Sequence, residues 1–210
     1  MTTSVALFPL ETVLFPGGHL PLQIFEVRYL DMIRKALAND AGFGVVTLLR
    51  GSEVRTPESV ESFASIGTLA EIRSATMPAP GLMQIRCGGT TRFRIQSRER
   101  LKHGLWVAQV VPVADDQNVE VPGELEDVAD ALHALLDRWH EQELSDEETP
   151  IRSPYHFNDC SWVANRWAEM LPLPAEEKLR LLALDNPLLR LELIQDCLHA
   201  AGMLGTPKRH

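Results

Sequence analysis

Near the N-terminus, short apolar runs alternate with prolines and glycines. The sequence there reads Leu7-Phe8-Pro9-Leu10, then Val13-Leu14-Phe15-Pro16-Gly17, then Leu20-Pro21-Leu22-Gln23-Ile24-Phe25-Glu26-Val27-Arg28-Tyr29. Proline fixes φ and removes a hydrogen-bond donor, which suits strand ends and edges, and glycine permits tight turns. The large apolar side chains are expected to be buried, namely those of Phe8, Phe15, Ile24 and Phe25. Glu26 is expected to cap the following helix or to pair with Arg28, so the stretch predicts architecture rather than direct ligand contacts.

The first 115 residues read as strands with one helix. Short apolar runs predict strands over residues 5–10, 13–15, 20–25, 44–49, 66–75, 82–97 and 105–113. Helical spacing predicts one helix over residues 26–39, with an apolar face of Val27, Leu30, Ile33 and Leu37. Residues 77–81 contain two prolines and a glycine and predict a hairpin connection, and the polar residues 50–62 predict a loop.

After residue 115 the hydrophobic period changes from two to about 3.6. We expect a β-rich domain over residues 1–115, a linker over residues 116–122 and a helical subdomain over residues 123–210. Helices are predicted over residues 125–139, 159–171 and 188–201, with another between Pro174 and the break at Asp185-Asn186-Pro187. Because strands come first and helices second, the fold class is α+β rather than an alternating parallel-sheet protein.

Charge follows the same division. The chain has 210 residues, 45% of them hydrophobic, and a net charge of -9. Residues 1–115 carry 12 basic and 10 acidic side chains, whereas residues 116–210 carry 8 and 19. The acidic total argues against a nonspecific nucleic-acid binder, but it does not describe the nearly neutral first part.

Neither a signal peptide nor an apolar run of about 20 residues is found, so no membrane segment is expected. The three cysteines, Cys87, Cys160 and Cys197, are odd in number and far apart. That pattern is not a disulfide framework and fits a reducing compartment, so we expect a cytoplasmic protein.

The motifs of common catalytic sites are missing from the sequence. It contains no P-loop, no G-x-G-x-x-G, no G-x-S-x-G and no C-x-x-C or H-E-x-x-H spacing. We therefore expect no enzyme, no cofactor and no resident metal.

A weaker metal-ligating pattern lies on the predicted helix over residues 125–139 and just beyond it. Steps of three and four place five side chains on one face: Asp130, His133, Asp137, His140 and Glu141. His and carboxylate could bind a divalent metal there, but the favoured interpretation is a solvated helix face, on which polar pairs at i,i+4 are common.

His156 and Cys160 stand four residues apart near a predicted helix start. A helix N-terminus lowers a thiol pKa, so a reactive thiolate is one interpretation. The alternative is a buried structural cysteine beside a surface histidine, and no third group is evident to orient a catalytic pair.

A basic stripe is predicted in the strand after the hairpin. Its members occupy even positions, namely Arg92, Arg94, Arg98, Arg100 and Lys102. In a continuous strand they would share one side and could bind phosphates; the alternative is an ordinary solvated sheet face.

The opening stretch resembles the signature of the Lon protease N-terminal (substrate-binding) domain family. Later segments are similar too: Phe43-Gly44-Val45-Val46, Ile66-Gly67-Thr68-Leu69-Ala70-Glu71-Ile72, Gly89-Thr90-Thr91-Arg92-Phe93-Arg94-Ile95 and Leu171-Pro172-Leu173. The matching motif residues, taken as mainly structural, are Phe8, Pro9, Leu10, Phe15, Pro16, Gly17, Leu20, Pro21, Leu22, Ile24, Phe25, Glu26, Arg28, Tyr29, Gly67, Arg92 and Phe93. The resemblance implies a PUA-like pseudobarrel followed by a helical bundle, without the ATPase and Ser-Lys peptidase of the full protease.

The resemblance and the missing motifs together lead to a noncatalytic binding module as the main hypothesis. Its expected partners are unfolded protein segments or another protein, held in a groove or at a strand edge. One alternative is an RNA-binding module that uses the basic stripe, and another is a metal-dependent hydrolase that uses the His/Asp helix face. A homodimer is also expected, because small binding modules often pair symmetrically.

Overall fold

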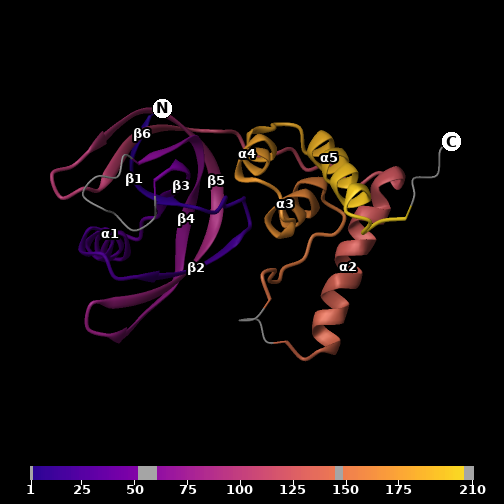
Figure 1. Ribbon diagram of the computed structural model, residues 1–210, viewed down its shortest axis with the longest axis horizontal. Coiled ribbons are helices and arrows are strands. Elements are labelled where there is room, and N and C mark those ends of the chain that lie inside the picture. The colour runs from indigo at the N-terminus through magenta and orange to yellow at the C-terminus, as the bar shows by residue number, and fades with distance from the viewer. Residues whose placement is uncertain (1, 52–60, 145–148, 206–210) are drawn as a thin grey trace. The chain divides into compact units, whose positions relative to one another are not determined.

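A computed structural model describes residues 2–51, 61–144 and 149–205. The chain divides into two compact units, Met1–Asp115 and Asp116–His210. The first is a β-sheet with one helix and the second is helical (Figure 1), so the α+β fold class predicted from the sequence is confirmed. In the described part of the chain, no helix is both long and apolar enough to cross a membrane.

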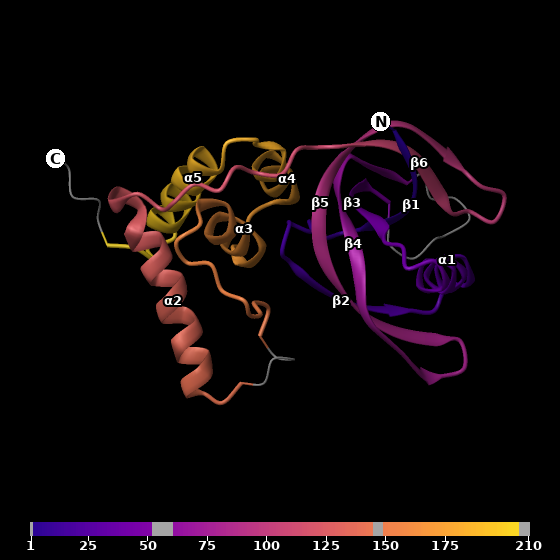
Figure 2. The same cartoon turned by 180° about the vertical axis from the view of Figure 1, so that it is seen from behind.

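The sheet of the first unit closes on itself. Its strands are β1 (Thr3–Leu10), β2 (His19–Ile24), β3 (Phe43–Arg50), β4 (Ser62–Ala79), β5 (Leu82–Arg100) and β6 (Trp106–Pro112). Their order is β2-β5-β4-β3-β1-β6, and an additional pairing of β5 with β6 completes a barrel (Figure 2). The β1–β3 pair is parallel and the other pairs are antiparallel. The long strands β4 and β5 form the predicted hairpin, with Gly81 at its tip at φ +79°.

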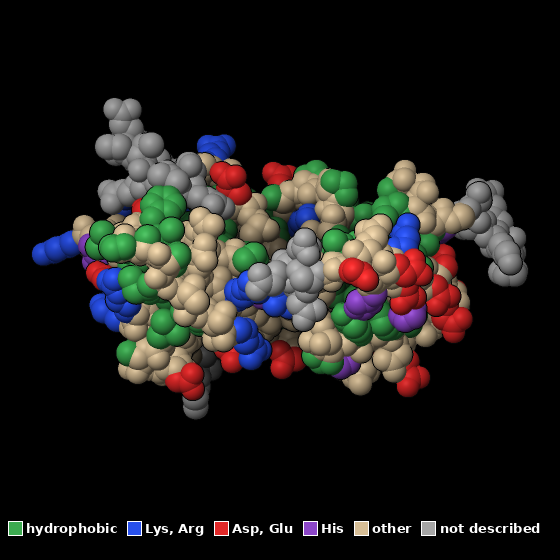
Figure 3. Space-filling model, turned by 90° about the horizontal axis from the view of Figure 1, so that it is seen from below, with side chains coloured by type: hydrophobic (Ala, Val, Ile, Leu, Met, Phe, Trp, Pro, Cys, Tyr) green, Lys and Arg blue, Asp and Glu red, His purple; other side chains and the backbone are tan. Residues whose placement is uncertain are grey.

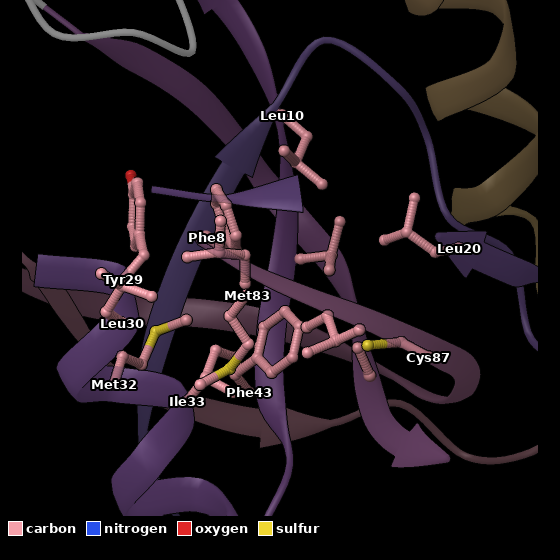
Figure 4. Packing of buried hydrophobic residues seen from close by; sticks show 14 of the residues in the cluster. Phe8, Leu10, Leu20, Tyr29, Leu30, Met32, Ile33, Phe43, Met83 and Cys87 are labelled. Atoms are coloured by element: carbon pink, nitrogen blue, oxygen red, sulfur yellow. The ribbon is translucent and has the colours of Figure 1, made fainter. Parts of the chain in front are cut away.

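One hydrophobic core lies between the sheet and helix α1 (Val27–Ala38) (Figure 4). Phe8 of β1 stacks on Tyr29 of α1 with ring centroids 4.0 Å apart. Ile33 and Phe43 are fully buried in the same cluster. A smaller core on other strands contains Leu7, Val46, Phe63, Phe93, Ala108 and Val110. Two members of the opening motif, Phe8 and Tyr29, therefore join β1 to α1.

The predicted core face of helix α1 is confirmed at Leu30 and Ile33 and wrong at its two ends. Its buried residues are Arg28, Tyr29, Leu30, Met32, Ile33 and Ala36. Val27 and Leu37, which were expected on the core face, are 72% and 45% exposed. Phe25, expected to be buried, is 56% exposed, because Ile24 occupies the core position at the end of β2 and alternation turns the next residue away.

The segment over residues 13–15 was predicted to be a strand and is not one, although all three side chains are buried. It leads into a turn in which Gly17 has φ +74°, a conformation that costs glycine little. Gly17 N–H donates to the carbonyl of Gly89 at 2.8 Å, and Gly89 N–H donates to the carbonyl of Gly18 at 2.9 Å. The backbone of this turn is thus fixed directly to β5. Of the predicted loop over residues 50–62, residues 52–60 lie outside the described residues.

The second unit contains the short helix η1 (Gly123–Leu125) and helices α2 (Glu126–Glu141), α3 (Cys160–Met170), α4 (Ala175–Ala183) and α5 (Pro187–Ala200). Sequence signals for the helix ends are confirmed at two starts. Asp159 accepts a hydrogen bond from Trp162 N–H at 2.6 Å, and Asn186 accepts from Leu188 and Leu189. At the other end of α5, Gly202 has φ +68° and directly follows the C-cap Ala201, which agrees with the predicted end of this helix at residue 201.

Residues 116–122, predicted as a linker, are held by hydrogen bonds to the start of α3. Cys160 N–H donates to Val119 at 2.9 Å, and Val121 N–H donates to Asn158 at 3.0 Å. Asp116 pairs with Arg190 of α5 at 2.6 Å. This segment therefore belongs to the packed structure of the second unit.

Candidate functional site

The outer edge of β4 is open over part of its length. β3 pairs with β4 from Ser62 to Ala70, whereas β5 pairs with it as far as Ala79. Among the described residues, no strand pairs with the other edge of β4 from Glu71 to Ala79. A strand edge of this kind presents N–H and C=O groups that another extended chain can pair with.

Exposed apolar side chains lie at the hairpin end of the sheet: Met77 is on β4 itself, and Phe25 and Val27 follow β2, which pairs with the other edge of β5. Ile24 of β2 pairs with Met83 of β5, and Thr76 of β4 pairs with Gln84. Phe25, Val27 and Met77, which follow those strand positions, are therefore at the hairpin end of the sheet and are 56%, 72% and 53% exposed. We call the β4 edge from Glu71 to Ala79, together with these three side chains, the β4 edge surface.

Features of the β4 edge limit indiscriminate pairing. An irregularity between Ile72 and Ser74 interrupts the register, and Glu71 forms an exposed ion pair with Arg73 at 3.0 Å. Pro78 adds a residue without a backbone donor. Bulges, charges and prolines are the usual protection of edge strands against aggregation, so this edge is suited to weak and selective pairing.

A buried polar network fixes the junction that carries Phe25 and Val27. Arg28 Nε donates to Glu26 at 2.9 Å, and its Nη1 donates to the carbonyl of Gly104 at 2.9 Å and to Glu61 at 3.4 Å. Trp106 Nε1 donates to Glu61 at 2.6 Å. The expected pairing of Glu26 with Arg28 is confirmed, whereas Glu26 makes no side-chain cap to α1.

The electrostatics of this network favour a charged guanidinium. Burial alone lowers the pKa of Arg28, but Tyr29 and the carboxylates of Glu26 and Glu61 raise it above its ordinary value overall. The guanidinium also lies 4.4 Å from the centroid of the Tyr29 ring. Arg28 therefore stays charged and links the start of α1 to the β5–β6 turn through its hydrogen bond to Gly104.

The predicted basic stripe does not form as a single row. Of its five members, Arg92 is 3% exposed and donates to the carbonyl of Ala114 at 3.3 Å. Lys102 lies after the end of β5, in the turn toward β6. The expectation that Arg92 and Lys102 would share an exposed strand face with the other three was wrong.

A β-bulge separates the other arginines. Ile95 and Ser97 pair with consecutive residues of β6, so β5 contains one extra residue between them. An extra residue reverses the alternation of side chains. Arg98 and Arg100 consequently face the opposite side of the sheet from Arg94.

Arg98 and Arg100 are engaged with aromatic rings of their own unit. The Arg98 guanidinium lies 4.3 Å from the centroid of Phe63 and 5.8 Å from that of Trp106, and it donates to the carbonyl of Phe63. Arg100 lies 5.9 Å from the Trp106 centroid. Nucleic-acid binding by these arginines stays a prediction, and the geometry no longer offers the continuous stripe that motivated it.

His156 and Cys160 do not form a reactive pair. Cys160 is fully buried, and its Sγ donates to the carbonyl of Glu120 at 3.5 Å. Burial, together with the Asp159 carboxylate, raises the pKa of Cys160 to about 11. The His156 ring instead packs edge to face on Trp162. The thiolate interpretation was therefore wrong, and the alternative of a buried cysteine beside a surface histidine describes the site.

Thiol alkylation provides a direct check of these cysteine environments. At about pH 8, a pKa of about 11 leaves roughly one Cys160 thiol in a thousand ionised. Burial raises the pKa of Cys87 to about 12. We expect iodoacetamide to label half-buried Cys197 first, and Cys87 and Cys160 only after unfolding in urea, as followed by peptide mass mapping. Labelling of Cys160 in the folded protein at the rate of Cys197 would contradict this.

The His/Asp face of α2 is an exposed helix face. His133 Nδ1 lies 3.3 Å from Asp137 Oδ2, and both side chains are more than half exposed. No group of three or more His, Cys, Asp or Glu side chains in the described ranges is arranged to hold a metal ion. Asp130, His140 and Glu141 share the face without joining the pair in such a group.

The geometry defines a class of protein: a small β-barrel with an open strand edge, followed by a helical unit. The family model of the ATP-dependent protease La (LON) substrate-binding domain matches residues 4–200, and the chain belongs to this family. The family predicted from the sequence is thus confirmed. No match was found among curated proteins.

Two solved structures are similar over nearly their whole length. A Lon N-terminal domain protein from Xanthomonas campestris has a TM-score of 0.73 and 31% identity, over 92% of this chain and 98% of that one. The N-terminal domain of a Mycobacterium avium complex Lon protease has a TM-score of 0.60 over 92% and 97% of the two chains. At 19% identity, the second likeness shows the fold alone.

Several family-motif residues occupy packed positions in this chain. Phe15 and Phe93 are fully buried, and a Cβ on Gly67 would lie 2.3 Å from the carbonyl oxygen of Val45. Phe25 differs from them, since it is exposed beside Val27 on the β4 edge surface. The open edge itself was not predicted, and the loss of clear alternation after Ile72 is the signal that could have indicated it.

Proposed function

We propose that this chain is a noncatalytic module that binds extended, apolar segments of other polypeptides at the β4 edge surface. The observation that carries the proposal is the open edge of β4 from Glu71 to Ala79, with Met77 exposed on β4 and Phe25 and Val27 exposed at the same hairpin end of the sheet. Membership of the LON substrate-binding domain family supports it. The free thiols of all three cysteines support a cytoplasmic location.

Binding would combine two contributions. The backbone of an unfolded segment pairs with β4 as an added strand, which supplies affinity without sequence preference. Apolar side chains of the segment then cover Phe25, Val27 and Met77. Each Å² of apolar surface removed from water in this way stabilises the complex by about 25 cal/mol. Folded proteins, which seldom expose an extended apolar segment, would not compete.

Introducing a charge into this surface should weaken binding strongly. We expect Met77→Glu and Phe25→Glu each to reduce affinity for an unfolded model protein, such as reduced carboxymethylated α-lactalbumin, by about tenfold, because a carboxylate would be buried against apolar side chains. Fluorescence anisotropy of the labelled model protein measures this. Since both side chains are more than half exposed, the fold should tolerate either change.

Leu49→Glu is the matched control. Leu49 is 49% exposed, but it lies near the end of β3 that pairs with the start of β4. The neighbouring residue Arg50 pairs there with Ser62, at the opposite end of β4 from the open edge. Binding should be unchanged in this variant. If all three variants weaken binding equally, the added negative charge alone explains the loss of affinity and the β4 edge surface is not the binding site. If the unsubstituted chain shows no saturable binding, the proposal is refuted.

Self-association is the competing use of the same edge. If two copies pair their β4 strands, sedimentation will show a dimer that Met77→Glu dissociates, and unfolded polypeptide will compete with dimer formation. If the chain stays dimeric while it binds unfolded polypeptide at full stoichiometry, the contact between the two copies lies outside the β4 edge surface.

A further inference from the structure

The second unit carries a cluster of three aromatic rings. Tyr155, Phe157 and Trp162 are half-buried, with ring centroids 5.3 to 6.2 Å apart. The Phe157 and Tyr155 rings meet Trp162 at interplanar angles of 80° and 65°. Rings at such angles present both faces and edges around one small area.

Histidines of two elements border these rings. His133 of α2 packs edge to face on Phe157 at 4.6 Å, and His140 of α2 lies 6.3 Å from Tyr155. His156 packs on Trp162 at 6.1 Å. All three histidines are exposed, and Figure 3 shows histidine side chains around a hydrophobic patch with acidic side chains beside them. The cluster is therefore connected to the outer face of α2.

The charges next to the cluster are mainly carboxylates. Asp137 pairs with His133 at 3.3 Å, and exposed Asp130 and Glu141 lie on the same helical face. Arg138 and Arg152 are the described arginines nearest to these residues in the sequence, and neither guanidinium lies over a ring of the cluster. An aromatic surface bordered by carboxylates attracts cations.

In the first unit, arginines of the chain itself cover the faces of aromatic rings. There, Arg28 lies over Tyr29, and Arg98 and Arg100 lie over Phe63 and Trp106. In the described part of the second unit, Tyr155, Phe157 and Trp162 have no equivalent. The same kind of ring surface is thus left for a cation from outside the chain.

We propose that Tyr155, Phe157 and Trp162, with Asp130, Asp137 and Glu141, form a binding surface for arginine- or lysine-bearing segments of a partner polypeptide. The guanidinium or ammonium group would lie on a ring face, while the carboxylates supply long-range attraction and hydrogen-bond acceptors. This surface differs in chemistry from the β4 edge surface, which takes apolar segments, and its existence does not depend on that proposal.

The test is a titration of the full chain with a labelled Ser/Gly peptide that carries several arginines, at physiological ionic strength. A peptide with glutamates in place of the arginines is the negative probe. We expect saturable binding of the arginine peptide alone. Phe157→Leu and Asp137→Asn should each weaken it, the former by about fivefold.

Asp40→Asn is the matched control for charge, because Asp40 is an exposed residue of the first unit at φ 49°, which asparagine tolerates. The Asp40→Asn variant should bind the arginine peptide with the same affinity as the unsubstituted chain. If Phe157→Leu binds as well as the unsubstituted chain, or Asp40→Asn weakens binding as much as Asp137→Asn, attraction by net charge alone explains the result and the proposal is overturned. Absence of saturable binding also overturns it.

Two further measurements separate the outcomes. Far-ultraviolet circular dichroism and thermal melting show whether Phe157→Leu remains folded, and Tyr155→Leu provides a second ring variant if it does not. Met77→Glu should bind the arginine peptide normally. If Met77→Glu loses binding of both the arginine peptide and the unfolded model protein, the two ligands share one surface and the separate site is refuted; loss of the unfolded model protein alone supports the separate site.

Discussion

Replacing Arg190 by methionine is expected to lower the free energy of unfolding of the second unit by about 3–5 kcal/mol. The Arg190 side chain is 1% exposed and lies at the centre of a polar network. It donates to Asp116 at 2.6 Å and to Asn165 at 3.1 Å. It also donates to the carbonyls of Leu181, at 3.0 Å, and Leu184.

The size of the effect follows from what remains after the substitution. Methionine fills similar volume but removes the guanidinium that pairs with the Asp116 carboxylate, which is 8% exposed. Several carbonyl and amide oxygens lose a charged donor at the same time, and each unsatisfied buried polar group costs about 1–3 kcal/mol. The network joins the start of the unit to α3, α4 and α5, so its loss affects the packing of all of them.

Urea unfolding followed by tryptophan fluorescence measures this change, because Trp167 is 2% exposed in the core of the second unit. Arg180→Met is the control: Arg180 is exposed on α4, so its loss should change stability by less than about 0.5 kcal/mol. Equal midpoints for Arg190→Met and Arg180→Met would show that the buried network contributes no stability.

The sequence could not distinguish Arg190 from a surface arginine. It stands in a helix of mixed pattern, and its main partner, Asp116, lies 74 residues earlier. By contrast, the end of α4 and start of α5 were predictable, because Asn186 and Pro187 are local signals whose geometry depends on neighbouring residues. Local chemistry therefore predicted where these two helices end and begin, and long-range pairing determined that Arg190 is buried.

The candidate sites show the same limit. The basic stripe was predicted from strict alternation, and one extra residue between Ile95 and Ser97 was enough to divide it. The β4 edge surface depends on where β3 begins relative to β4, at the pair of Phe43 with Ala70. No local pattern reports that register, so the hairpin was predictable from sequence but its open edge was not.

The aromatic cluster of the second unit was visible only in part. Tyr155 and Phe157 stand between two predicted helices, whereas His133 and His140 were assigned to a helix face. Their contacts with one another require the connector to fold against α2, which puts Phe157 4.6 Å from His133. Two features that the sequence treated separately thus form one surface.

Gly67→Ala is expected to destabilise the first unit by at least about 3 kcal/mol and to prevent its folding in marginal conditions. A Cβ at residue 67 would lie 2.3 Å from the carbonyl oxygen of Val45, and 2.8 Å from the Phe93 ring and from Val46 Cγ1. The first contact is with the backbone of the neighbouring strand, which cannot move without breaking the β3–β4 pairing. The second is with a fully buried ring in the smaller core.

Two other glycines separate this steric effect from general effects of alanine. A Cβ on Gly123 would meet open space at an ordinary φ, so Gly123→Ala should be neutral or slightly stabilising. Gly81 also has open space but lies at φ +79°, so Gly81→Ala should cost only the backbone strain of about 1 kcal/mol. Thermal melting of the three variants should therefore rank Gly123→Ala above Gly81→Ala, and Gly81→Ala well above Gly67→Ala. If Gly67→Ala and Gly81→Ala have the same melting temperature, the close approach of β3 and β4 is not the reason for glycine at position 67 of the family motif.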